Sequence, residues 1–353
     1  MGSIEPAPLF QVANYGPAVN LPEPYPGNTT FPLALSPSNQ NTPLTELTQE
    51  ISHLSKAGEI QKLLKTHGAI YFKDLNLKDV DEFSRFAHAF GWAPHEDIGN
   101  PVRRTVLAKN VATANEGPNT QPVYPHNEFG LSPHFPAYVF FYCISAPTSG
   151  GETPINNSIV LYHHLKERHP EFIAKIEEKG VKYQLFYPNT SRTQTTSPGN
   201  SVLQAYGTHV LDTDDTATAR SKSKRRSEDC RLRNGCDLRV WQHLPAIRTH
   251  PHSGLPSFFN NTISRFLNAL AADTLLPPHI NKDGKYQPPV FYGDGELIPR
   301  KYFDSAVEII GETRSLVTWK EGDVLLLDNL AVQHAREPWV GKRVLAASLW
   351  NEA

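Results

Sequence analysis

Three side chains with metal-binding chemistry stand out in this sequence of 353 residues. His126 and Glu128 form a His-x-Glu motif just before the apolar run 137–144, and His334 follows the apolar run 324–328. Side chains two residues apart in an extended strand project to the same side, so His126 and Glu128 can face one ion. Two imidazoles and one carboxylate on one face of an octahedron leave three positions open, which suits ferrous iron.

An arginine downstream of His334 can bind an acidic co-substrate. Arg343 lies beyond His334 on a predicted strand, where its guanidinium can bind a carboxylate through two hydrogen bonds. Thr153 follows the turn 150–152, whose paired glycines allow close approach of the backbone. Taken alone, Thr153 is a turn hydroxyl, and a lone His-x-Glu is weak evidence for a metal. Arg336 is the reserve candidate for this carboxylate-binding role, although a salt bridge or a loop anchor explains it more simply.

Composition argues against several other classes of protein. The net charge is −2, with 34 basic and 36 acidic residues, so neither nucleic acid nor an anionic membrane is indicated as a partner. Three cysteines do not suit the disulfide framework of a secreted domain, and no apolar run is long enough to span a bilayer. We expect a small-molecule substrate and a cytoplasmic location. The oligomeric state is open, a homodimer being one option.

The apolar pattern predicts a mainly β protein with helical insertions, in the α+β class. Short strands interrupted by Pro and Gly favour a jelly-roll or barrel-like pair of sheets. One helical pattern covers 44–67 with Gly68 as its stop, and another begins at Asp79 or Asp81 and ends at residue 90. Strands are predicted at 69–72, 137–144, 238–241, 256–261, 316–319, 324–328 and 344–350, and further helices at 159–165, 172–176, 263–275 and 302–313.

The two halves of the candidate site lie at opposite ends of the chain, which favours one large domain over two. Residues 1–45 are rich in proline and are predicted to form an extended arm, and residues 46–353 a single domain. A polar flexible loop is expected at about 208–236. Its basic run 220–226 has no interleaved aromatic residues, so we interpret it as solvated rather than as a nuclear-import or nucleic-acid patch.

From about residue 107 to the C-terminus the sequence resembles the taurine dioxygenase-like, or clavaminate synthase-like, family of Fe(II)- and 2-oxoglutarate-dependent oxygenases. The motifs that carry the resemblance occur in the order of the family. They are His126-Asn127-Glu128, Ser132-Pro133-x-Phe135-Pro136, Gly150-Gly151-Glu152-Thr153-Pro154, Thr249-His250-Pro251-x-Ser253-Gly254 before Phe258-Phe259-Asn260, and Asp328-Asn329 with His334-Ala335-Arg336-x-Pro338-Trp339-x-Gly341-x-Arg343.

The resemblance implies a double-stranded β-helix, or jelly roll, with iron bound by His126, Glu128 and His334. It also implies that Arg343, helped by Thr153, binds the distal carboxylate of 2-oxoglutarate, with O2 as the second co-substrate. The carboxylate ligand is Glu rather than the commoner Asp, and its extra methylene still allows it to reach the metal. Its presence argues against a halogenase, because halogenating relatives replace this carboxylate with a small residue.

The resemblance further implies that 2-oxoglutarate is converted to succinate and CO2 while a substrate C–H bond is oxidised. We expect hydroxylation, desaturation or cyclisation of an amino acid or an amino-acid-derived natural product, by analogy with the specialised-metabolite branch of the family. Residues close to the motifs along the chain are the candidates for substrate contacts. These are Asn115, Glu116, Tyr124, Asn156 and Phe259.

Two other functions fit parts of the same pattern. A zinc hydrolase could use the same two histidines and glutamate, but it would need neither the downstream arginine nor the Gly-Gly-Glu-Thr turn. A non-catalytic jelly-roll binding protein with a degenerate metal site is the alternative from another class. His134, His250 and His252 are interpreted as structural, because none has the spacing to complete the site.

Overall fold

Two sheets that share one apolar interior carry the candidate site. The computed structural model describes residues 9–96, 104–114, 117–187, 217–218, 221, 229–233, 237–284 and 286–352. The larger sheet has nine strands in the order β1-β4-β5-β20-β10-β23-β8-β7, with β6 paired to β23. Its strands are β1 (Phe10–Val12), β4 (Leu33–Pro37), β5 (Ala69–Phe72), β6 (Ala93–Pro94), β7 (Val106–Ala108), β8 (Val111–Thr113), β10 (Tyr138–Ser145), β20 (Val324–Asp328) and β23 (Val344–Asn351).

The smaller of these two sheets has four strands in the order β19-β12-β21-β9, and every pairing in it is antiparallel. It packs on the large sheet through an apolar cluster that includes Phe141 and Leu325 from the large sheet and Ile155 and Val332 from the small one. Its strands are β9 (Val123–His126), β12 (Thr153–Asn157), β19 (Ser315–Val317) and β21 (Val332–Arg336).

The continuous apolar run of β10 is explained by burial on both faces. Val139 and Phe141 face the small sheet, whereas Phe140 and Tyr142 belong to the cluster on the other side. Side chains alternate between the two faces of a strand, so a strand in the middle of two layers is apolar at every position. The central position of β10 and β20, which pair with each other, therefore follows from their composition.

Three helices cover the outer face of the large sheet, α1 (Leu44–Lys56), α2 (Glu59–His67) and α3 (Val80–His88). The prediction of one helix over 44–67 was wrong, because Gly58 has a φ of 76° and separates α1 from α2. Gly68 ends α2 as predicted. Asp79 caps α3, since its side chain accepts a hydrogen bond from Glu82 N over 2.9 Å.

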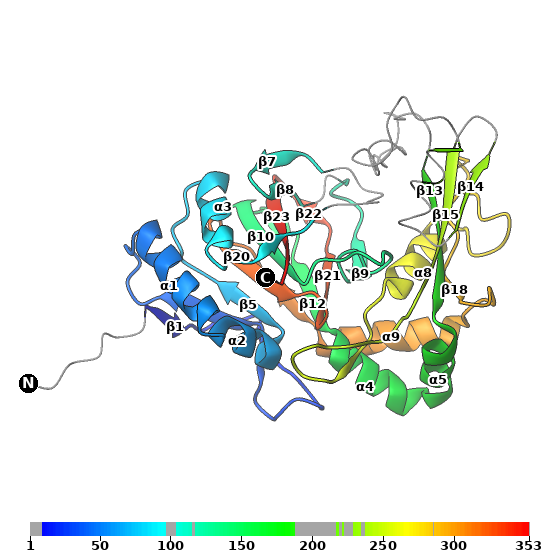
Figure 1. Ribbon diagram of the computed structural model, residues 1–353, viewed down its shortest axis with the longest axis horizontal. Helices are drawn as coiled ribbons and strands as arrows, with labels where there is room; N and C mark the ends of the chain where they lie inside the picture. The colour runs from blue at the N-terminus through cyan, green and yellow to red at the C-terminus, as the bar shows by residue number, and fades with distance from the viewer. Residues whose placement is uncertain are drawn as a thin grey trace, which may run out of the picture.

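A third apolar cluster lies at the other end of the molecule, where Figure 1 shows the remaining large helices beside a separate sheet. That sheet has the order β14-β15-β13-β18. No helix in the described ranges is long and apolar enough to cross a membrane. The elements are α4 (Ser158–Arg168), α5 (Pro170–Lys179), α8 (Thr262–Ala271), α9 (Arg300–Thr313), β13 (Val181–Tyr187), β14 (Asp229–Arg233), β15 (Asp237–Leu244) and β18 (Phe291–Tyr292).

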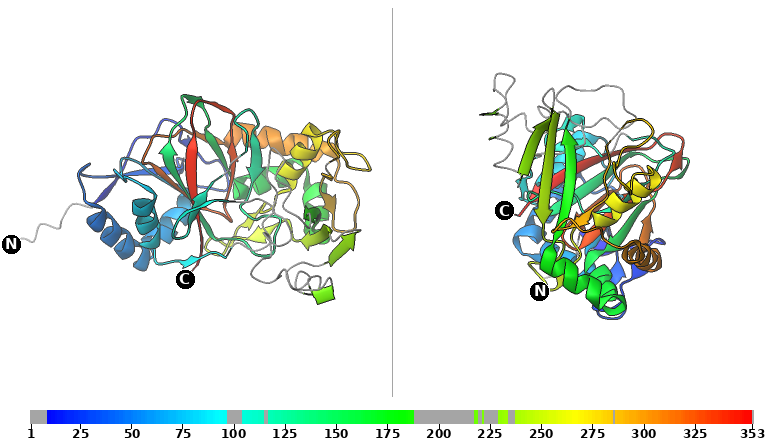
Figure 2. Two further views of the ribbon diagram at one scale, coloured as in Figure 1. Left: turned by 90° about the horizontal axis from the view of Figure 1, so that it is seen from above. Right: turned by 90° about the vertical axis from the view of Figure 1, so that its right-hand side faces the viewer.

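The proline-rich N-terminal segment contributes to the sheet, which its composition did not predict. β4 runs parallel to β5, and β1 pairs with β4. Pro32 and Pro37 lie at the ends of this stretch, so the residues between them keep the backbone N–H groups that a ladder needs. Figure 2 shows the blue N-terminal segment running along one side of the sheet. The arm and single-domain division of the chain stays a prediction.

The remaining strands form two-stranded sheets, and one of these strands is shorter than predicted. The prediction of a strand over 256–261 holds only for 256–257, because the chain then turns into α8. Most of the polar loop 208–236, and of its basic run 220–226, lies outside the described residues. The short strands are β2 (Val19–Asn20), β3 (Thr30–Phe31), β11 (Ser149–Gly150), β16 (Arg248–Thr249), β17 (Pro256–Ser257) and β22 (Trp339–Val340).

Candidate metal centre

The pairing of β9 with β21 places His126 directly opposite His334. The centroids of the two imidazole rings lie 4.3 Å apart. Glu128 Oε2 lies 3.3 Å from His334 Nε2 and 4.0 Å from His126 Nε2. One ligand atom from each of the three residues lies within 4.8 Å of the others, so the set can surround a single ion. Among the described residues this is the only such cluster of His, Cys, Asp or Glu.

The orientation and charge of His126 suit a metal ligand. Its Nδ1 lies 2.9 Å from the carbonyl oxygen of Tyr124, and donation to that oxygen leaves the lone pair on Nε2. Burial, reinforced by repulsion from His334, lowers the pKa of His126 to about 4. The imidazole is therefore neutral at neutral pH and offers its lone pair toward Glu128. Phe141 closes the floor of the site, with its ring centroid 5.0 Å from that of His334.

Glu128 is held by an arginine that the sequence analysis did not identify. Arg104 Nη2 donates a hydrogen bond to Glu128 Oε1 over 2.5 Å, and the two side chains are only 13% and 8% exposed. Burial alone would raise the pKa of Glu128, but Arg104, His334 and His126 together outweigh burial and lower this pKa below its usual range. The carboxylate is therefore ionised and ready to bind a cation. Arg104 lies in no motif, so no sequence signal pointed to it.

The backbone of Glu128 is clamped by the side-chain amide of Asn329. Asn329 Oδ1 accepts from Glu128 N over 2.8 Å, and Asn329 Nδ2 donates to Glu128 O over 2.9 Å. The next residue, Phe129, has a φ of 57°, a strained conformation for a bulky side chain. The amide pairing holds this sharp turn in place, which fixes the direction in which the Glu128 side chain leaves the backbone.

Asn127, between the two N-terminal members of the triad, ties the motif to the rest of the fold. Its Nδ2 donates to Asn329 O over 2.7 Å and to Val332 O over 3.1 Å. Its backbone N donates to Asn261 Oδ1 over 3.0 Å. Asn127 is fully buried, and a buried amide with its hydrogen bonds made is stable in only one arrangement. The three-residue motif is thus rigid although it lies at the end of a short strand.

Arg343 and Thr153, the predicted carboxylate-binding pair, line the same cavity as the three candidate metal ligands. Arg343 donates from Nε to Gly151 O over 2.7 Å and from Nη2 to Thr153 Oγ1 over 3.1 Å. Trp319 Nε1 also donates to Thr153 Oγ1, over 2.9 Å. Because this oxygen accepts two hydrogen bonds, the hydrogen of the Thr153 hydroxyl remains to be donated to an anion. Trp319 is a second residue that the sequence analysis missed.

Arg343 is a half-buried cation whose charge can attract an anionic partner. Burial lowers its pKa to about 10, so the guanidinium stays charged at neutral pH. Within the described part of the chain no carboxylate lies at ion-pair distance from it. Gly151 has a φ of +71°, and a Cβ there would lie 2.8 Å from Arg343 Cδ, so the paired glycines make room for the arginine.

These residues line one cavity of about 1420 Å³. The cavity contains His126, Glu128, His334, Thr153 and Arg343, and it extends to α8 and to the segment that follows this helix.

The candidate substrate contacts divide into three groups. Tyr124 lines the cavity, whereas Asn115 and Glu116 lie outside the described residues. Asn156 does not line it: it pairs with Gln333 across the two strands, and its Nδ2 donates to Gln333 Oε1 over 3.2 Å.

Side chains alternate between the two faces of a strand, and this explains why Asn156 does not reach the cavity. Asn156 is paired with Gln333, the neighbour of His334, and so faces the opposite side of the sheet. Phe259 does not line the cavity either. It is buried against Phe135, with ring centroids 4.6 Å apart.

Arg336, the reserve arginine, anchors the loop before β9. Its Nη2 donates to Pro118 O over 3.1 Å and to Gln121 O over 2.8 Å, and its guanidinium stacks on Trp339. This is the simpler of its two predicted roles. Arg336 also lines the cavity, where it shapes the wall beside β9.

Comparison with known proteins identifies the family. The family model described as taurine catabolism dioxygenase TauD, TfdA family, matches residues 31–349. The chain belongs to this family. It is 29% identical to a clavaminate synthase-like protein of Arabidopsis thaliana, over 90% of this chain and 93% of that protein. It is 23% identical to the dapdiamide synthesis protein DdaC of Enterobacter agglomerans, over 82% and 84%.

The fold has a solved counterpart as well. The crystal structure of a taurine dioxygenase from Burkholderia xenovorans superposes with a TM-score of 0.52 at 14% identity, covering 98% of this chain and 90% of that one. As a member of this family the protein is an Fe(II)- and 2-oxoglutarate-dependent dioxygenase, which uses O2 as its oxidant. The donor set of two imidazoles and one carboxylate fits Fe(II). Family membership therefore decides against the zinc hydrolase and the non-catalytic binding protein.

Proposed function

We propose that this dioxygenase oxidises a C–H bond of a small metabolite, an amino acid or an amino-acid-derived natural product. The iron ligands in this proposal are His126, Glu128 and His334. The observation that carries it is the convergence of their three donor atoms within 4.8 Å on one cavity. The same cavity is lined by the half-buried Arg343, which has no carboxylate of the described residues at ion-pair distance. The names of the two curated relatives, clavaminate synthase-like and dapdiamide synthesis, support a substrate of this class.

We assign the co-substrate end of the cavity to Arg343 and Thr153. The guanidinium neutralises the distal carboxylate of 2-oxoglutarate, and the free hydroxyl hydrogen of Thr153 donates to the same group. Trp319 orients Thr153 through the hydrogen bond to its oxygen. A guanidinium and a hydroxyl that meet at one point favour an anionic group there, because a neutral ligand would leave the half-buried cation without an anionic partner.

Fe(II), when bound, would supply the oxidation together with 2-oxoglutarate and O2: 2-oxoglutarate would be converted to succinate and CO2, and the substrate would either gain one oxygen atom or lose two hydrogens, which leave as water. The protein positions the metal ligands and excludes water from the site. Hydrogen bonding to Tyr124 O keeps His126 in the tautomer with Nε2 toward the ion, and Asn329 keeps Glu128 in place. Phe141 and Leu345 supply apolar wall that excludes water from the reacting C–H bond.

We further infer that the two facing sheets form the double-stranded β-helix of this family. Their shared apolar cluster and the antiparallel pairing of β9, β12, β19 and β21 support this architecture. Earlier and later strands of the chain alternate throughout the small sheet and across β5-β20-β10-β23-β8 in the middle of the large sheet, as a wound pair of sheets requires.

The experiment that tests the function is a search for substrate-stimulated succinate formation. Purified protein with Fe(II), 2-oxoglutarate and O2 is offered a panel of amino acids, their amides and small peptides, and succinate is measured. We expect one group of related compounds to raise succinate formation and to gain an oxygen atom or lose two hydrogens. Protein that binds Fe(II) but gives neither a 2-oxoglutarate-dependent absorbance nor any succinate would contradict the proposal.

A further inference from the structure

We propose that Arg104 is a positioning residue of the metal centre, which holds one oxygen of Glu128 so that the other faces the two imidazoles. The inference rests on the proposed function, because it concerns the assigned ligand Glu128. The two carboxylate oxygens are already divided between different neighbours. Arg104 Nη2 donates to Oε1 over 2.5 Å, whereas Oε2 lies 3.3 Å from His334 Nε2.

The length of the Glu128 side chain explains why such a holder is useful. Glu has one more rotatable bond than Asp, and a free carboxylate can turn one oxygen or both toward an ion. If both oxygens bound the ion, one of the positions needed by 2-oxoglutarate and O2 would be lost. A hydrogen bond from a guanidinium to Oε1 leaves only Oε2 for the ion.

Arg104 reaches Glu128 from the opposite sheet. It lies just before β7 at the edge of the nine-stranded sheet, whereas Glu128 follows β9 of the four-stranded sheet. The backbone next to Arg104 is fixed, because Thr105 N donates to Thr113 Oγ1 over 2.9 Å and Thr113 N donates to Thr105 O over 2.8 Å. The Arg104–Glu128 pair therefore bridges the two sheets at the cavity wall.

Another arginine of the same cavity shows what a structural arginine does there. Arg265 Nη2 donates to the backbone carbonyls of Gln184, over 3.2 Å, and Pro288, over 3.4 Å. Arg104 differs because it binds a carboxylate, and both side chains of this pair are mostly buried. Its guanidinium is directed at a proposed metal ligand rather than at a loop, so it can control how that ligand presents itself.

Mn(II) binding tests this role without relying on turnover. We would measure the affinity by calorimetric titration and the ligand environment by electron paramagnetic resonance of the bound Mn(II). Arg104→Ala should weaken binding by about 10- to 100-fold, the usual effect of removing a group that orients a metal ligand, and should change the spectrum. Arg104→Lys should recover part of the affinity. The matched control, Arg265→Ala, should bind Mn(II) with the parental affinity and spectrum.

A Glu128→Asp background separates positioning from a general effect on folding. The shorter carboxylate lacks the extra rotatable bond, so Arg104→Ala should lower Mn(II) affinity much less in this background than in the parent. Equal losses in the two backgrounds would overturn the proposal. It would also fall if Arg104→Ala bound Mn(II) with the parental affinity and spectrum. Failure of the proposed function looks different, because the parental protein would then form no succinate with any compound in the panel.

Discussion

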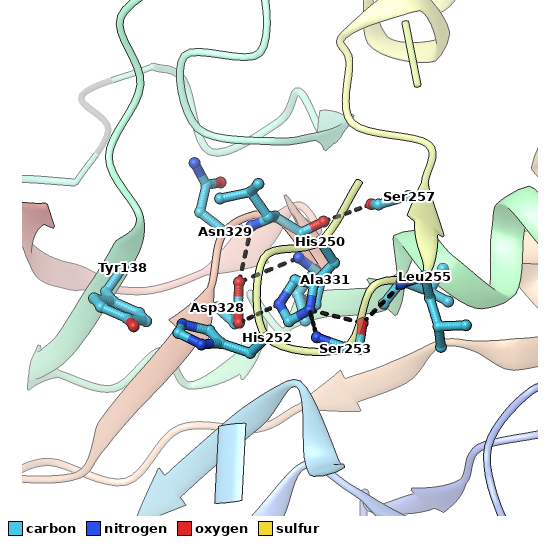
Figure 3. Close-up of polar contacts among 12 residues, drawn as sticks. Tyr138, His250, His252, Ser253, Leu255, Ser257, Asp328, Asn329 and Ala331 are labelled. Atoms are coloured by element: carbon cyan, nitrogen blue, oxygen red, sulfur yellow. Dashed lines mark hydrogen bonds and ion pairs between the residues drawn. The ribbon is translucent and has the colours of Figure 1, made fainter. Parts of the chain in front are cut away.

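Two histidine–carboxylate clusters are attached to the segment 328–334, and only one of them is open. In the first, Glu128 Oε2 faces the Nε2 atoms of His126 and His334 across a cavity. In the second, the side chains of His250 and Asp328 are 1% and 3% exposed, and His250 Nε2 lies 2.8 Å from Asp328 Oδ2. Figure 3 shows this closed cluster at the turn that follows β20.

The closed cluster has no bonding capacity left for a ligand. Asp328 Oδ1 accepts from Leu330 N over 3.0 Å and from Ala331 N over 3.3 Å, and His250 Nδ1 lies 2.8 Å from Ser253 Oγ. Both nitrogens of the imidazole and both oxygens of the carboxylate are therefore occupied within the protein (Figure 3).

The open cluster differs in what remains unsatisfied rather than in residue type. His334 Nδ1 is buried and has no hydrogen-bond partner among the described residues, and the Nε2 atoms of both histidines point toward Glu128. The two Nε2 atoms and Oε2 of Glu128 can all donate a lone pair to a cation. Such a group of atoms in a mostly buried site is unfavourable unless a cation binds there. Incomplete pairing, and not the presence of His and Asp or Glu, distinguishes a metal centre from a structural contact.

The largest expected effect is loss of metal from the open cluster. His126→Ala and Glu128→Ala should each lower the affinity for Fe(II) or Mn(II) by more than about 100-fold and abolish succinate formation, because a ligand matters more than the groups that orient it. Calorimetric titration and succinate assays measure this. His250→Ala is the contrasting variant: its folded fraction should still bind one ion. Full metal binding by the Glu128 variant would remove that residue from the ligand set.

The next effect concerns the stability of the closed cluster. Asp328→Ala should lower the free energy of unfolding by about 3–5 kcal/mol, because it leaves the buried imidazole of His250 and the backbone N–H of Leu330 without their acceptor. Urea unfolding followed by fluorescence gives the value. Asp328→Asn keeps an acceptor for the turn and should be less destabilising. An Asp328→Ala protein as stable as the parent would mean that this contact contributes nothing to the fold.

A smaller effect is expected at the co-substrate end of the open cavity. Arg343→Ala should raise the KM for 2-oxoglutarate by about 10- to 100-fold, because charge-assisted hydrogen bonds contribute about 1.5–3 kcal/mol. Metal affinity in the absence of 2-oxoglutarate should not change. Steady-state kinetics with 2-oxoglutarate as the varied substrate measure the effect, and Arg343→Lys serves as the charge-conserving control. An unchanged KM would assign the co-substrate to a different residue.

The smallest effect belongs to the rim of the closed cluster. Ser253→Ala removes the hydroxyl beside His250 Nδ1 and should lower the free energy of unfolding by about 1 kcal/mol, the usual net value of one hydrogen bond. Mn(II) affinity should stay at the parental value. Thermal unfolding and metal titration on one preparation test both statements. A weaker Mn(II) affinity would show that the two clusters are coupled through the segment between them.

Local chemistry made part of this protein predictable. Continuous apolar runs identified β10, β20 and β23, because a strand buried on both faces is apolar at every position. The predicted members of the triad, with Thr153 and Arg343, lie on one cavity. Their roles as ligands and co-substrate contacts stay predictions that the proposed experiments address.

Residues that act through long-range contacts were missed or misplaced. Arg104 contacts Glu128 from 24 residues away on another sheet, and Asn329 from 201 residues away. Arg104 lies in no motif, and the motif that contains Asn329 does not reveal its contact with the Glu128 backbone. Asn156 was misplaced because closeness along the chain says nothing about which face of a strand points to the cavity.

The sequence by itself determined which residue types could bind an ion, their order along the chain and the apolar strands that bring them into the interior. Only the tertiary structure showed why one histidine–carboxylate cluster is closed and the other open. His250 and His334 are both buried beside a carboxylate, and the motifs that favoured His334 as the ligand do not reveal the contacts that close the His250 cluster. The difference arises because the backbone turn after Asp328 supplies donors that close one cluster, while the pairing of β9 with β21 leaves the other facing a cavity.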